Sequence, residues 1–522
     1  MRTLAVAVLL SWGFAAFAQA PAPAPVPRFD INQFVIEGNT LFELYELQAL
    51  VEPFAGKQRD FGDIQKALEA LQDHYSGKGY NAVRVLIPEQ DIRAGQVRLQ
   101  VIEARIRNVK VEGNRFYNNE NVRRSLPALK EGEAPNTKRI GENVQLANEN
   151  PVRQQRVVLE STEEIGKVDA SVKVTDDDPY NVTVFLDNTG NSTTGYYRAG
   201  FGVVNSNFDN KDRVINVQVI TSPTQWDDVQ IFGAGYRVPV YEWNSILDVY
   251  AGYSDVESGT VQNLFSVAGA GTIFGGRYTQ ILTRYGAYEQ KLSLGFEHKA
   301  FTNDVVLVGG TTTLVPDVTT QPLLINYFGR YAVPGHDFSY TLGVAENMPT
   351  DDGDASQAAI EQARPGATAN FRIWRASMAY SYAIGGDAIL RFSIDGQYTR
   401  DALVPGEQYG LGGQNSVRGF SEREVANDIG HRVSLEAYGP EIGPSIGADW
   451  RARMLAFFDA GHGRDNQPVR LEENGMSSAG FGVRANRGRS ISLRADYAVV
   501  LNNAGTRDQG KARAHFGIAY TF

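Results

Sequence analysis

The sequence predicts a mainly β protein: a C-terminal 16-stranded antiparallel transmembrane β-barrel preceded by two small α+β domains of the order β-α-α-β-β. From Tyr180 onward, polar and apolar residues alternate in segments of about ten residues, the length that a tilted strand needs to cross a bilayer. A Glu-Gly-Asn motif occurs at residues 37–39 and again at 112–114, which indicates an internal repeat. The final alternating segment ends on Phe522, and a terminal aromatic residue is common in outer-membrane barrels.

Composition narrows the classes of function. The chain has 522 residues with 60 Asp+Glu against 50 Lys+Arg, so it lacks the basic surface that phosphate neutralisation needs, and we expect no nucleic-acid partner. The absence of cysteine excludes thiolate metal sites, disulfides and cysteine nucleophiles. The 6 histidines are scattered, with no HExxH motif and no paired ligand spacing. We therefore expect no catalytic residue, no metal and no cofactor, and predict that the protein is not an enzyme.

Residues 1–20 have the features of a secretory signal peptide. Arg2 precedes an apolar stretch, and Ala18-Gln-Ala20 matches a small-x-small cleavage site. The apolar stretch is shorter than the roughly 18 residues that span a bilayer, which disfavours a membrane anchor. Residues 21–29 then form a Pro/Ala-rich spacer. An exported chain of this kind is periplasmic, secreted or an outer-membrane barrel.

The two small domains are predicted at residues 30–105 and 106–177. The segments Phe34–Phe42 and Val109–Tyr117 share the Glu-Gly-Asn motif, and a strand that ends in Gly-Asn predicts a turn. After the first copy, five apolar residues at helical spacing predict an amphipathic helix: Phe61, Ile64, Leu68, Leu71 and Tyr75. The second copy repeats the pattern more weakly. Each unit is therefore predicted to have the order strand, helix, helix, strand, strand.

Strand Ala82–Pro88 of the first domain is a candidate docking edge. A three-stranded sheet covered on one face by helices leaves an edge free, which suits the addition of an extended peptide. We expect a partner protein to dock along this edge at Val83, Val85 and Leu86. The alternative is that both domains are only spacers, since exposed edges are usually protected rather than used.

Residues 178–522 are predicted to form the barrel, with an even number of strands, as single-chain bacterial barrels require. Sixteen strands are wide enough to enclose an aqueous lumen. A soluble sandwich also alternates, but rarely places Arg, Asp and Gly opposite apolar residues in strand after strand. The candidate strands lie near 180–187, 196–206, 212–222, 229–240, 245–256, 267–282, 288–301, 321–334, 337–347, 367–384, 388–402, 431–440, 450–462, 476–486, 490–501 and 511–522. We find no helical stretch in this region.

A long loop interrupts the barrel at residues 404–430. Loops of this length in a compact domain are often functional. The loop carries a Gly-rich run followed by Val417, Arg418, Gly419 and Phe420, and we expect it to fold inward with these four residues at its tip.

Strand parity supplies partners for Arg418. An arginine buried among barrel walls needs a carboxylate, and Asp459 shares the polar, lumen-facing side of its strand with two arginines. Glu436 lies on the corresponding face of a neighbouring strand. We therefore expect an Arg418–Asp459 contact with Glu436 as a second acceptor, while Gly419 lets the backbone approach the wall and Phe420 packs behind it. The alternative is an external lid with Arg418 in solvent.

These motifs resemble those of the outer-membrane transporters of two-partner secretion, the TpsB class of hemolysin secretion/activation type. That class belongs to the superfamily of outer-membrane barrels that carry polypeptide-transport-associated (POTRA) domains. The two repeats are similar to POTRA domains. The other shared motifs are Asn148-Glu-Asn-Pro-Val-Arg-Gln154, Asp187-Asn-Thr-Gly190, Gly412-Gly-Gln-Asn-Ser-Val-Arg-Gly-Phe420, and the late strand motif of Phe458, Asp459, Ala460 and Gly461.

The resemblance implies a transporter in the bacterial outer membrane with its POTRA domains in the periplasm. They would capture an unfolded, secreted partner protein (a TpsA-like cargo), and the barrel would pass it to the cell surface without a nucleotide. Outer-membrane lipids and the barrel-assembly machinery would be further partners, with Phe516, Tyr520 and Phe522 as the C-terminal assembly signal.

The chain departs from the family in one respect, and two other functions stay open. Many members begin with a helix that plugs the barrel, whereas only about ten residues, several of them proline, lie between Pro21 and Ile31. We expect no plug helix. One alternative function is an insertase that folds other barrels, which predicts more than two POTRA repeats and a loosely paired seam between first and last strand. The other is a diffusion porin, which needs no periplasmic repeats.

Overall fold

The chain divides into two compact units, Met1–Arg105 with Glu164–Gly166, and Ile106–Glu163 with Lys167–Phe522. The expected signal peptide, most of the expected spacer and the question of a plug helix lie outside the residues that the structure describes. A computed structural model describes residues 27–92, 94–191, 194–226, 229–256, 259–261, 265–267, 270–302, 316–467 and 473–522.

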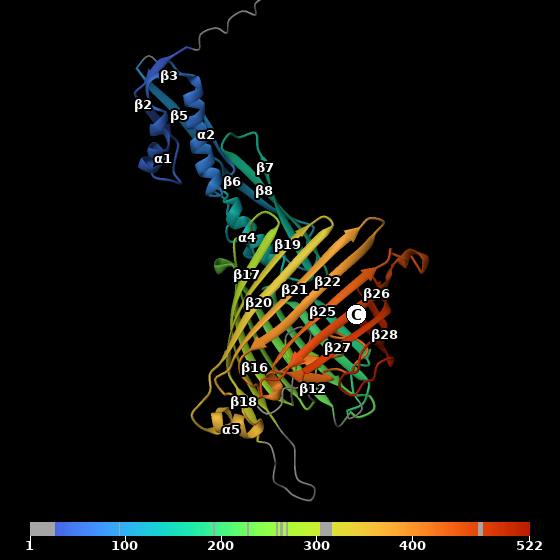
Figure 1. Cartoon of the computed structure of the whole chain (residues 1–522). Coiled ribbons are helices and arrows are strands. Elements are labelled where there is room, and N and C mark those ends of the chain that lie inside the picture. The colour runs from blue at the N-terminus through green and yellow to red at the C-terminus, as the bar shows by residue number, and fades with distance from the viewer. Residues whose placement is uncertain are drawn as a thin grey trace, which may run out of the picture. The chain divides into compact units, whose positions relative to one another are not determined.

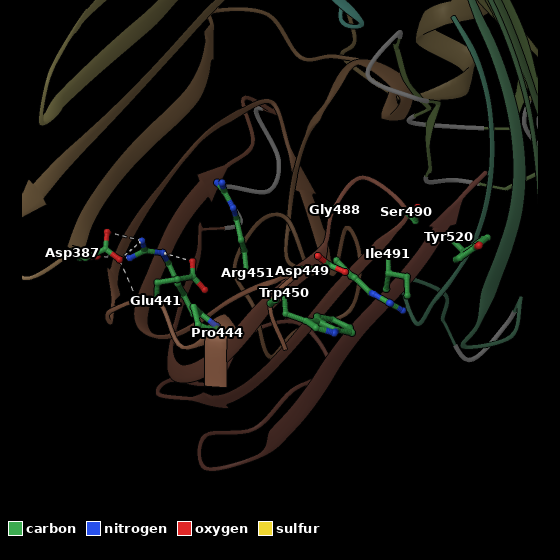
Figure 2. Close-up of a pocket in the computed structure, with 13 residues that line it drawn as sticks. Asp387, Glu441, Pro444, Asp449, Trp450, Arg451, Gly488, Ser490, Ile491 and Tyr520 are labelled. Carbon is green, nitrogen blue, oxygen red and sulfur yellow. Dashed lines mark hydrogen bonds and ion pairs between the residues drawn. The ribbon is translucent and has the colours of Figure 1, made fainter. Parts of the chain in front are cut away.

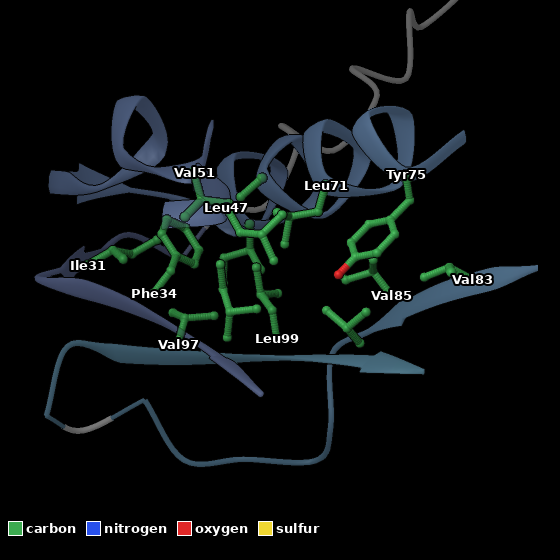
Figure 3. Packing of buried hydrophobic residues seen from close by; sticks show 14 residues of the cluster. Ile31, Phe34, Leu47, Val51, Leu71, Tyr75, Val83, Val85, Val97 and Leu99 are labelled. Atoms are coloured by element: carbon green, nitrogen blue, oxygen red, sulfur yellow. The ribbon is translucent and has the colours of Figure 1, made fainter. Parts of the chain in front are cut away.

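The first unit contains a three-stranded sheet covered by helices on one face. Its strand order is β2 (Gln33–Glu37), β5 (Gln96–Glu103), β4 (Val83–Leu86), with β2 parallel and β4 antiparallel to β5. Helices α1 (Leu44–Val51) and α2 (Phe61–Gly77) lie above it, and their apolar side chains point at the strands (Figure 3). A short pair that the sequence did not predict, β1 (Phe29–Ile31) with β3 (Gly56–Arg59), precedes α2.

Helix α2 has a defined start and a buried stripe. The Asp60 side chain accepts a hydrogen bond from Asp63 N while the Asp63 side chain accepts one from Asp60 N, which is a capping box. Its fully buried residues are Ile64, Ala67, Leu71 and Tyr75. The predicted helical spacing is therefore confirmed. No helix in the described part of the chain is long and apolar enough to cross a membrane.

The second small domain has the predicted order as well. Strand β6 (Arg105–Glu112) is followed by α3 (Asn119–Arg124), α4 (Thr137–Ala147), β7 (Arg153–Ser161) and β8 (Lys167–Asp176), and the sheet order is β6-β8-β7. Asn118 and Asn136 cap the two helices through their side-chain oxygens. The fold class β-α-α-β-β is thus confirmed for both repeats.

The repeated Glu-Gly-Asn motif has a steric cause. Gly38 and Gly113 both have a positive φ, +86° and +87°. A Cβ at either position would lie 2.4 Å from a backbone carbonyl oxygen of the adjacent strand, that of Val101 or Val174. Only glycine fits both constraints, so the motif marks the same tight exit from the first strand in each domain.

The remaining chain forms a closed antiparallel barrel (Figure 1). Within the described residues, β18 and β19 count as one strand interrupted at Gln321, because both pair with β17, and the barrel then has 16 strands. In order they are β9 (Tyr180–Asp187), β10 (Arg198–Phe208), β11 (Arg213–Thr221), β12 (Gln230–Val240), β13 (Ser245–Ser254), β16 (Gly271–Ile281), β17 (Tyr288–Phe301), β18 (Val318–Thr320) with β19 (Pro322–Val333), β20 (His336–Asn347), β21 (Arg372–Ile384), β22 (Ala388–Thr399), β25 (Ile429–Tyr438), β26 (Trp450–Arg464), β27 (Glu473–Arg487), β28 (Ile491–Val500) and β29 (Ala512–Thr521).

The structure differs from two of the predictions in the loop that precedes β21. The candidate strand 367–384 was too long, since β21 begins only at Arg372. The expectation of no helix after Tyr180 was also wrong, because α5 (Gln357–Ala363) precedes β21, capped by the Ser356 side chain. The apolar residues before β21 pack in the loop rather than in a strand: Ala367, Ala369 and Phe371 are fully buried. Helix α5 lies at the end of the barrel opposite to α4 (Figure 1).

The two faces of the strands differ as a membrane barrel requires. Large apolar side chains, such as Phe232, Leu342 and Phe481, are exposed on the outer face. On β29, Ile518 and Tyr520 are exposed on this outer face, and Phe516 has the same parity; Phe522, directly after the strand, is also exposed. Polar side chains therefore line the lumen, and the loop described next lies among them.

Candidate functional site in the barrel lumen

The long loop between β22 and β25 is a folded hairpin. Its flanking strands end at Thr399 and begin at Ile429, so it spans residues 400–428 rather than 404–430. Strands β23 (Tyr409–Leu411) and β24 (Val425–Asn427) pair to form its stem. The hydroxyl of Tyr409 donates to Asp395 Oδ2 on the lumen face of β22 at 2.5 Å, which fixes the stem against the inner wall.

The tip of this hairpin carries a buried arginine. Arg418 is 2% exposed, and its Nε and Nη2 donate to the two carboxylate oxygens of Asp459 at 2.7 and 2.9 Å. Its Nη1 lies 2.9 Å from Glu436 Oε1 and 3.5 Å from Asp496 Oδ1. The structure thus brings together Arg418, Asp459 and Glu436, the three residues singled out in the sequence, and adds Asp496. This fork-to-carboxylate geometry is the strongest kind of ion pair.

Further contacts hold the tip from three sides. The Arg418 Cζ lies 3.5 Å from the ring centroid of Phe457, a cation–π contact. The Gly419 backbone N donates to His515 Nε2 at 2.9 Å, and Ser434 Oγ donates to Asp459 at 2.6 Å. These partners lie on β25, β26 and β29, so the tip joins strands from the last third of the barrel.

Apolar residues of the tip fill the rest of its binding site on the inner barrel wall, which we call the seat. Val417 and Phe420 are fully buried, in one cluster with Leu411, Met476 and Val500. Phe458, by contrast, is 43% exposed on the outer face of β26, and Ala460 alternates with the buried Asp459. Of the late strand motif, therefore, Asp459 and Gly461 face the loop, whereas Phe458 and Ala460 do not.

Gly461 creates room for the tip. A Cβ at this position would lie 2.8 Å from Leu411 Cδ2 and 3.1 Å from Val417 Cγ2. Gly419 itself has a φ of +94°, in the left-handed region that favours glycine. Gly461 on the strand and Gly419 on the loop thus both allow the loop tip to pack closely against the barrel wall.

We predict that Gly461→Val loosens the seated tip, because overpacking a filled site costs about 1–3 kcal/mol. The expected result is faster cleavage of the loop by a protease added outside the cell. Gly475→Val is the matched control, since the nearest atom to its Cβ would be His462 Cδ2 at 3.9 Å. Equal cleavage rates in both variants would contradict the steric role of Gly461.

Charge compensation at the tip is close to complete. Burial by itself lowers the pKa of the Arg418 guanidinium, but the hydrogen bonds and charge of Asp459, followed by Glu436 and Asp496, raise it above its usual value. Asp496 also pairs with Arg484 and Arg494 at 2.9 and 2.8 Å. The Arg418 guanidinium therefore stays charged in its buried position.

Glu422 lies on the return side of the tip, and its pKa falls near neutral pH. Burial raises the pKa of its carboxyl to about 7, although a backbone hydrogen bond from Gln414 and the charge of Arg513 oppose the change. Because the seated state raises this pKa above the ordinary value of about 4.3, the stability that Glu422 contributes to the seat is present at acidic pH and is lost as the pH rises through about 7.

We therefore expect hydrogen exchange across residues 412–424 to accelerate between pH 6 and 8 after correction for intrinsic rates. Glu422→Gln keeps the shape of the side chain and removes the proton equilibrium, so its exchange should show no such pH dependence. An unchanged pH dependence in the variant would assign the effect to another group.

Two buried acids anchor the base of the loop, and sequence reasoning missed both. Glu407, 2% exposed, lies 3.1 Å from Lys299 Nζ and accepts from Thr320 Oγ1 at 2.9 Å. Asp428, fully buried, lies 2.5 Å from Arg364 Nη1 of the loop that carries α5. No motif marks these residues. A sequence feature that could have indicated Glu407 is that Lys299 lies on the lumen-facing side of its strand and needs a counter-charge there.

The expected docking edge of the first unit is not free. Val83 and Val85 are buried in the core, and only Leu86, at 44%, is exposed. The Gln72 side chain covers the backbone of the edge: its Nε2 donates to Val83 O at 2.7 Å and its Oε1 accepts from Val85 N at 3.1 Å. A strand added at β4 would have to displace Gln72 from these two groups.

A hollow lies at the barrel end where β25 and β26 are joined. It has a volume of about 880 Å³, and its lining includes Asp387, Glu441, Arg451 and Arg453 (Figure 2). Arg453 is bound by Asp387 at 2.8 Å and by Glu441 at 3.5 Å. Asp387 and Glu441 therefore share Arg453 as their counter-charge. Among the described residues, no group of three or more His, Asp or Glu side chains is placed to hold a metal ion.

Models of known protein families match both the barrel region and the first small domain of this chain. The model of the haemolysin secretion/activation protein family ShlB/FhaC/HecB matches residues 166–485, more than half of the chain, and the model of the ShlB-type POTRA domain matches residues 29–104. The heme/hemopexin transporter protein HuxB of Haemophilus influenzae is 19% identical over 484 residues, which cover 88% of this chain and 80% of HuxB.

Solved structures agree on the fold. CdiB from Escherichia coli superposes with a TM-score of 0.75 at 19% identity, covering 97% of this chain and 92% of that one. BamA from Haemophilus ducreyi lacking POTRA domains 1–3 is less similar, with a TM-score of 0.50 at 15% identity, covering 95% of this chain and 100% of that one. The chain therefore belongs to the haemolysin secretion/activation protein family ShlB/FhaC/HecB, the outer-membrane transporters of two-partner secretion.

Proposed function

We propose that this transporter uses the seated hairpin as the gate of its export channel. The observation that carries the proposal is the tip contact, in which Arg418 joins Asp459, Glu436 and Asp496 inside the lumen. The family consists of transporters rather than enzymes. At rest the hairpin occupies lumen space, and a passing chain displaces it or moves past it.

The cargo is an unfolded, secreted protein of the TpsA type. A barrel of this width admits an extended chain or a hairpin but not a folded domain. No nucleotide is required, because folding of the cargo outside the cell supplies the direction. The POTRA domains capture the cargo in the periplasm, and pairing at the β4 edge requires the Gln72 amide to leave Val83 and Val85.

Two further partners follow from the outer face. Phe516, Tyr520 and Phe522 form an apolar row on the last strand, which suits recognition by the barrel-assembly machinery during insertion. The exposed apolar girdle then contacts outer-membrane lipids. Neither role requires a cofactor or a metal.

The insertase alternative has one observation in its favour, the short seam of the barrel. The β29–β9 ladder joins 5 residue pairs, from Gly517↔Asp187 to Thr521↔Thr183. Asn188 extends this seam, since its side chain donates to Ala514 O at 2.8 Å and accepts from Phe516 N at 2.9 Å. The seam is therefore short but bonded beyond its last pair, and the described chain has the two repeats of a transporter. A porin needs neither repeat.

Co-expression decides between these functions. Cells that contain this chain and its secreted partner should release the partner into the medium, while cells without the chain retain it in the periplasm. Loss of other outer-membrane barrels on depletion of the chain, with no effect on any secreted protein, would favour the insertase instead.

A further inference from the structure

We propose that Arg153 is a positioning residue, which locks the second POTRA domain onto two turns of the barrel and keeps this joint closed throughout export. The inference rests on the proposed export function. It concerns Ile106–Glu163 and Lys167–Phe522, which form one compact unit.

Arg153 lies at the start of β7 and is completely buried. Its Nη1 donates to Asp212 Oδ1 at 2.7 Å and to Asn121 Oδ1 at 2.6 Å. Its Nη2 donates to the Tyr241 hydroxyl at 3.3 Å, and that hydroxyl donates to Asp212 Oδ2 at 2.7 Å. The Tyr117 ring lies 4.9 Å from Cζ. Asp212 and Tyr241 belong to the barrel, so one side chain of the domain bridges two separate barrel turns.

The first of these turns, between β10 and β11, adopts a conformation that needs support. Asp209, Asn210 and Asp212 have φ values of +55°, +51° and +59°, which non-glycine residues rarely adopt. Asn121 of the domain donates to Asn210 O at 2.8 Å and to Asn207 Oδ1 at 2.9 Å. The domain therefore stabilises the turn in the shape that presents Asp212 to Arg153.

Further contacts hold the second POTRA domain against the same two barrel turns. Tyr117 and Asn150 both donate to Ser206 O, at 3.1 and 2.9 Å. At the second turn, Asn143 donates to Tyr241 O at 3.2 Å. Apolar residues from both sides form one cluster around this turn: Leu146, Ala147, Tyr241, Ile246 and Ile281.

Opening the joint would expose this network as a whole. Arg153 and Asp212 would each lose a buried counter-charge, and breaking such a pair is costly because the remaining charge stays uncompensated. A swinging domain would be expected to use a wetter, less buried contact. We infer that the second domain delivers cargo to the lumen from a fixed position.

A reversible staple tests whether the joint stays closed. Glu149 and Lys291 form an ion pair of 2.6 Å across the same joint, with side chains 27% and 21% exposed, outside the Arg153 network. The chain has no native cysteine, so a short, reducible bis-thiol cross-linker on Glu149→Cys with Lys291→Cys joins only these positions. The double variant in cells should export the partner equally well, within twofold, before linking, after linking and after reduction. A tenfold loss on linking that reduction reverses would overturn the proposal.

Arg153→Ala in the same double-cysteine background tests the positioning role itself. We expect export to fall at least tenfold before linking and to recover after linking, because the staple replaces the lost positioning contact. Unimpaired export by Arg153→Ala, or impaired export that the staple does not restore, would overturn the role of Arg153. Failure of the proposed function itself gives a different result, namely that the parent chain exports no partner in any state.

Discussion

Replacing Arg418 by alanine is expected to reduce export of the partner protein about tenfold or more while the barrel still inserts in the outer membrane. The substitution leaves Asp459, Glu436 and Asp496 around an empty site. Removing one partner of a buried pair typically costs about 3–5 kcal/mol, because the other charge stays buried and uncompensated. The tip then leaves its seat, and the channel loses the defined resting state from which cargo opens it.

Two variants sharpen this experiment. Arg418→Lys keeps the charge but cannot bond both oxygens of Asp459, so we expect it to restore only part of the export. Arg451→Ala removes an exposed arginine from the same lumen-facing row of β26 as Asp459, and should export normally. Export is measured as partner in the medium, and insertion as heat-resistant migration in detergent. Equal export by the parent chain and Arg418→Ala would refute the role of the tip.

Deleting residues 30–105 is expected to abolish export and leave the barrel folded. The deleted segment has its own hydrophobic core, built around Phe34, Leu47, Leu71 and Val97, none of which contributes to a barrel cluster. The remaining chain keeps Arg153 and its joint, so cargo capture is lost while the entrance to the lumen is retained. Heat-resistant migration in detergent should therefore be unchanged.

A point variant controls for the size of that deletion. Gln72→Ala uncovers Val83 O and Val85 N without touching the core, and should leave export intact or raise it. Normal export by the 30–105 deletion would show that the first domain is only a spacer.

The barrel could be predicted from the sequence because side chains of a strand alternate with a period of two. A shift of one residue would turn every side chain to the other face, so the pattern fixes which residues meet the lumen. Parity alone therefore placed Asp459 and Glu436 on the inner wall. It placed Asp496 there too, but could not show that Asp496 lies level with Arg418, because that height depends on the stagger between strands.

Other contacts had no local signal at all. Gln72 follows the buried Leu71 on α2 and gives no sign in the sequence that its amide covers a strand edge. Arg153 stands in a recognisable motif, yet its partner Asp212 lies in a turn of ordinary polar residues. Helix α5 is only 7 residues long, too short for its periodicity to be distinguished from that of a loop. These features depend on the meeting of segments distant in the chain.

The most direct test of the seated hairpin is a cysteine pair at positions 418 and 459. The chain contains no native cysteine, so a disulfide formed under mild oxidation can come only from contact between these two positions. We predict that this disulfide forms in cells and blocks export until it is reduced, since it holds the tip in the lumen. Absence of the disulfide, together with full labelling of a cysteine at position 418 by an impermeant thiol reagent outside the cell, would contradict the Arg418–Asp459 contact and place Arg418 on an external lid.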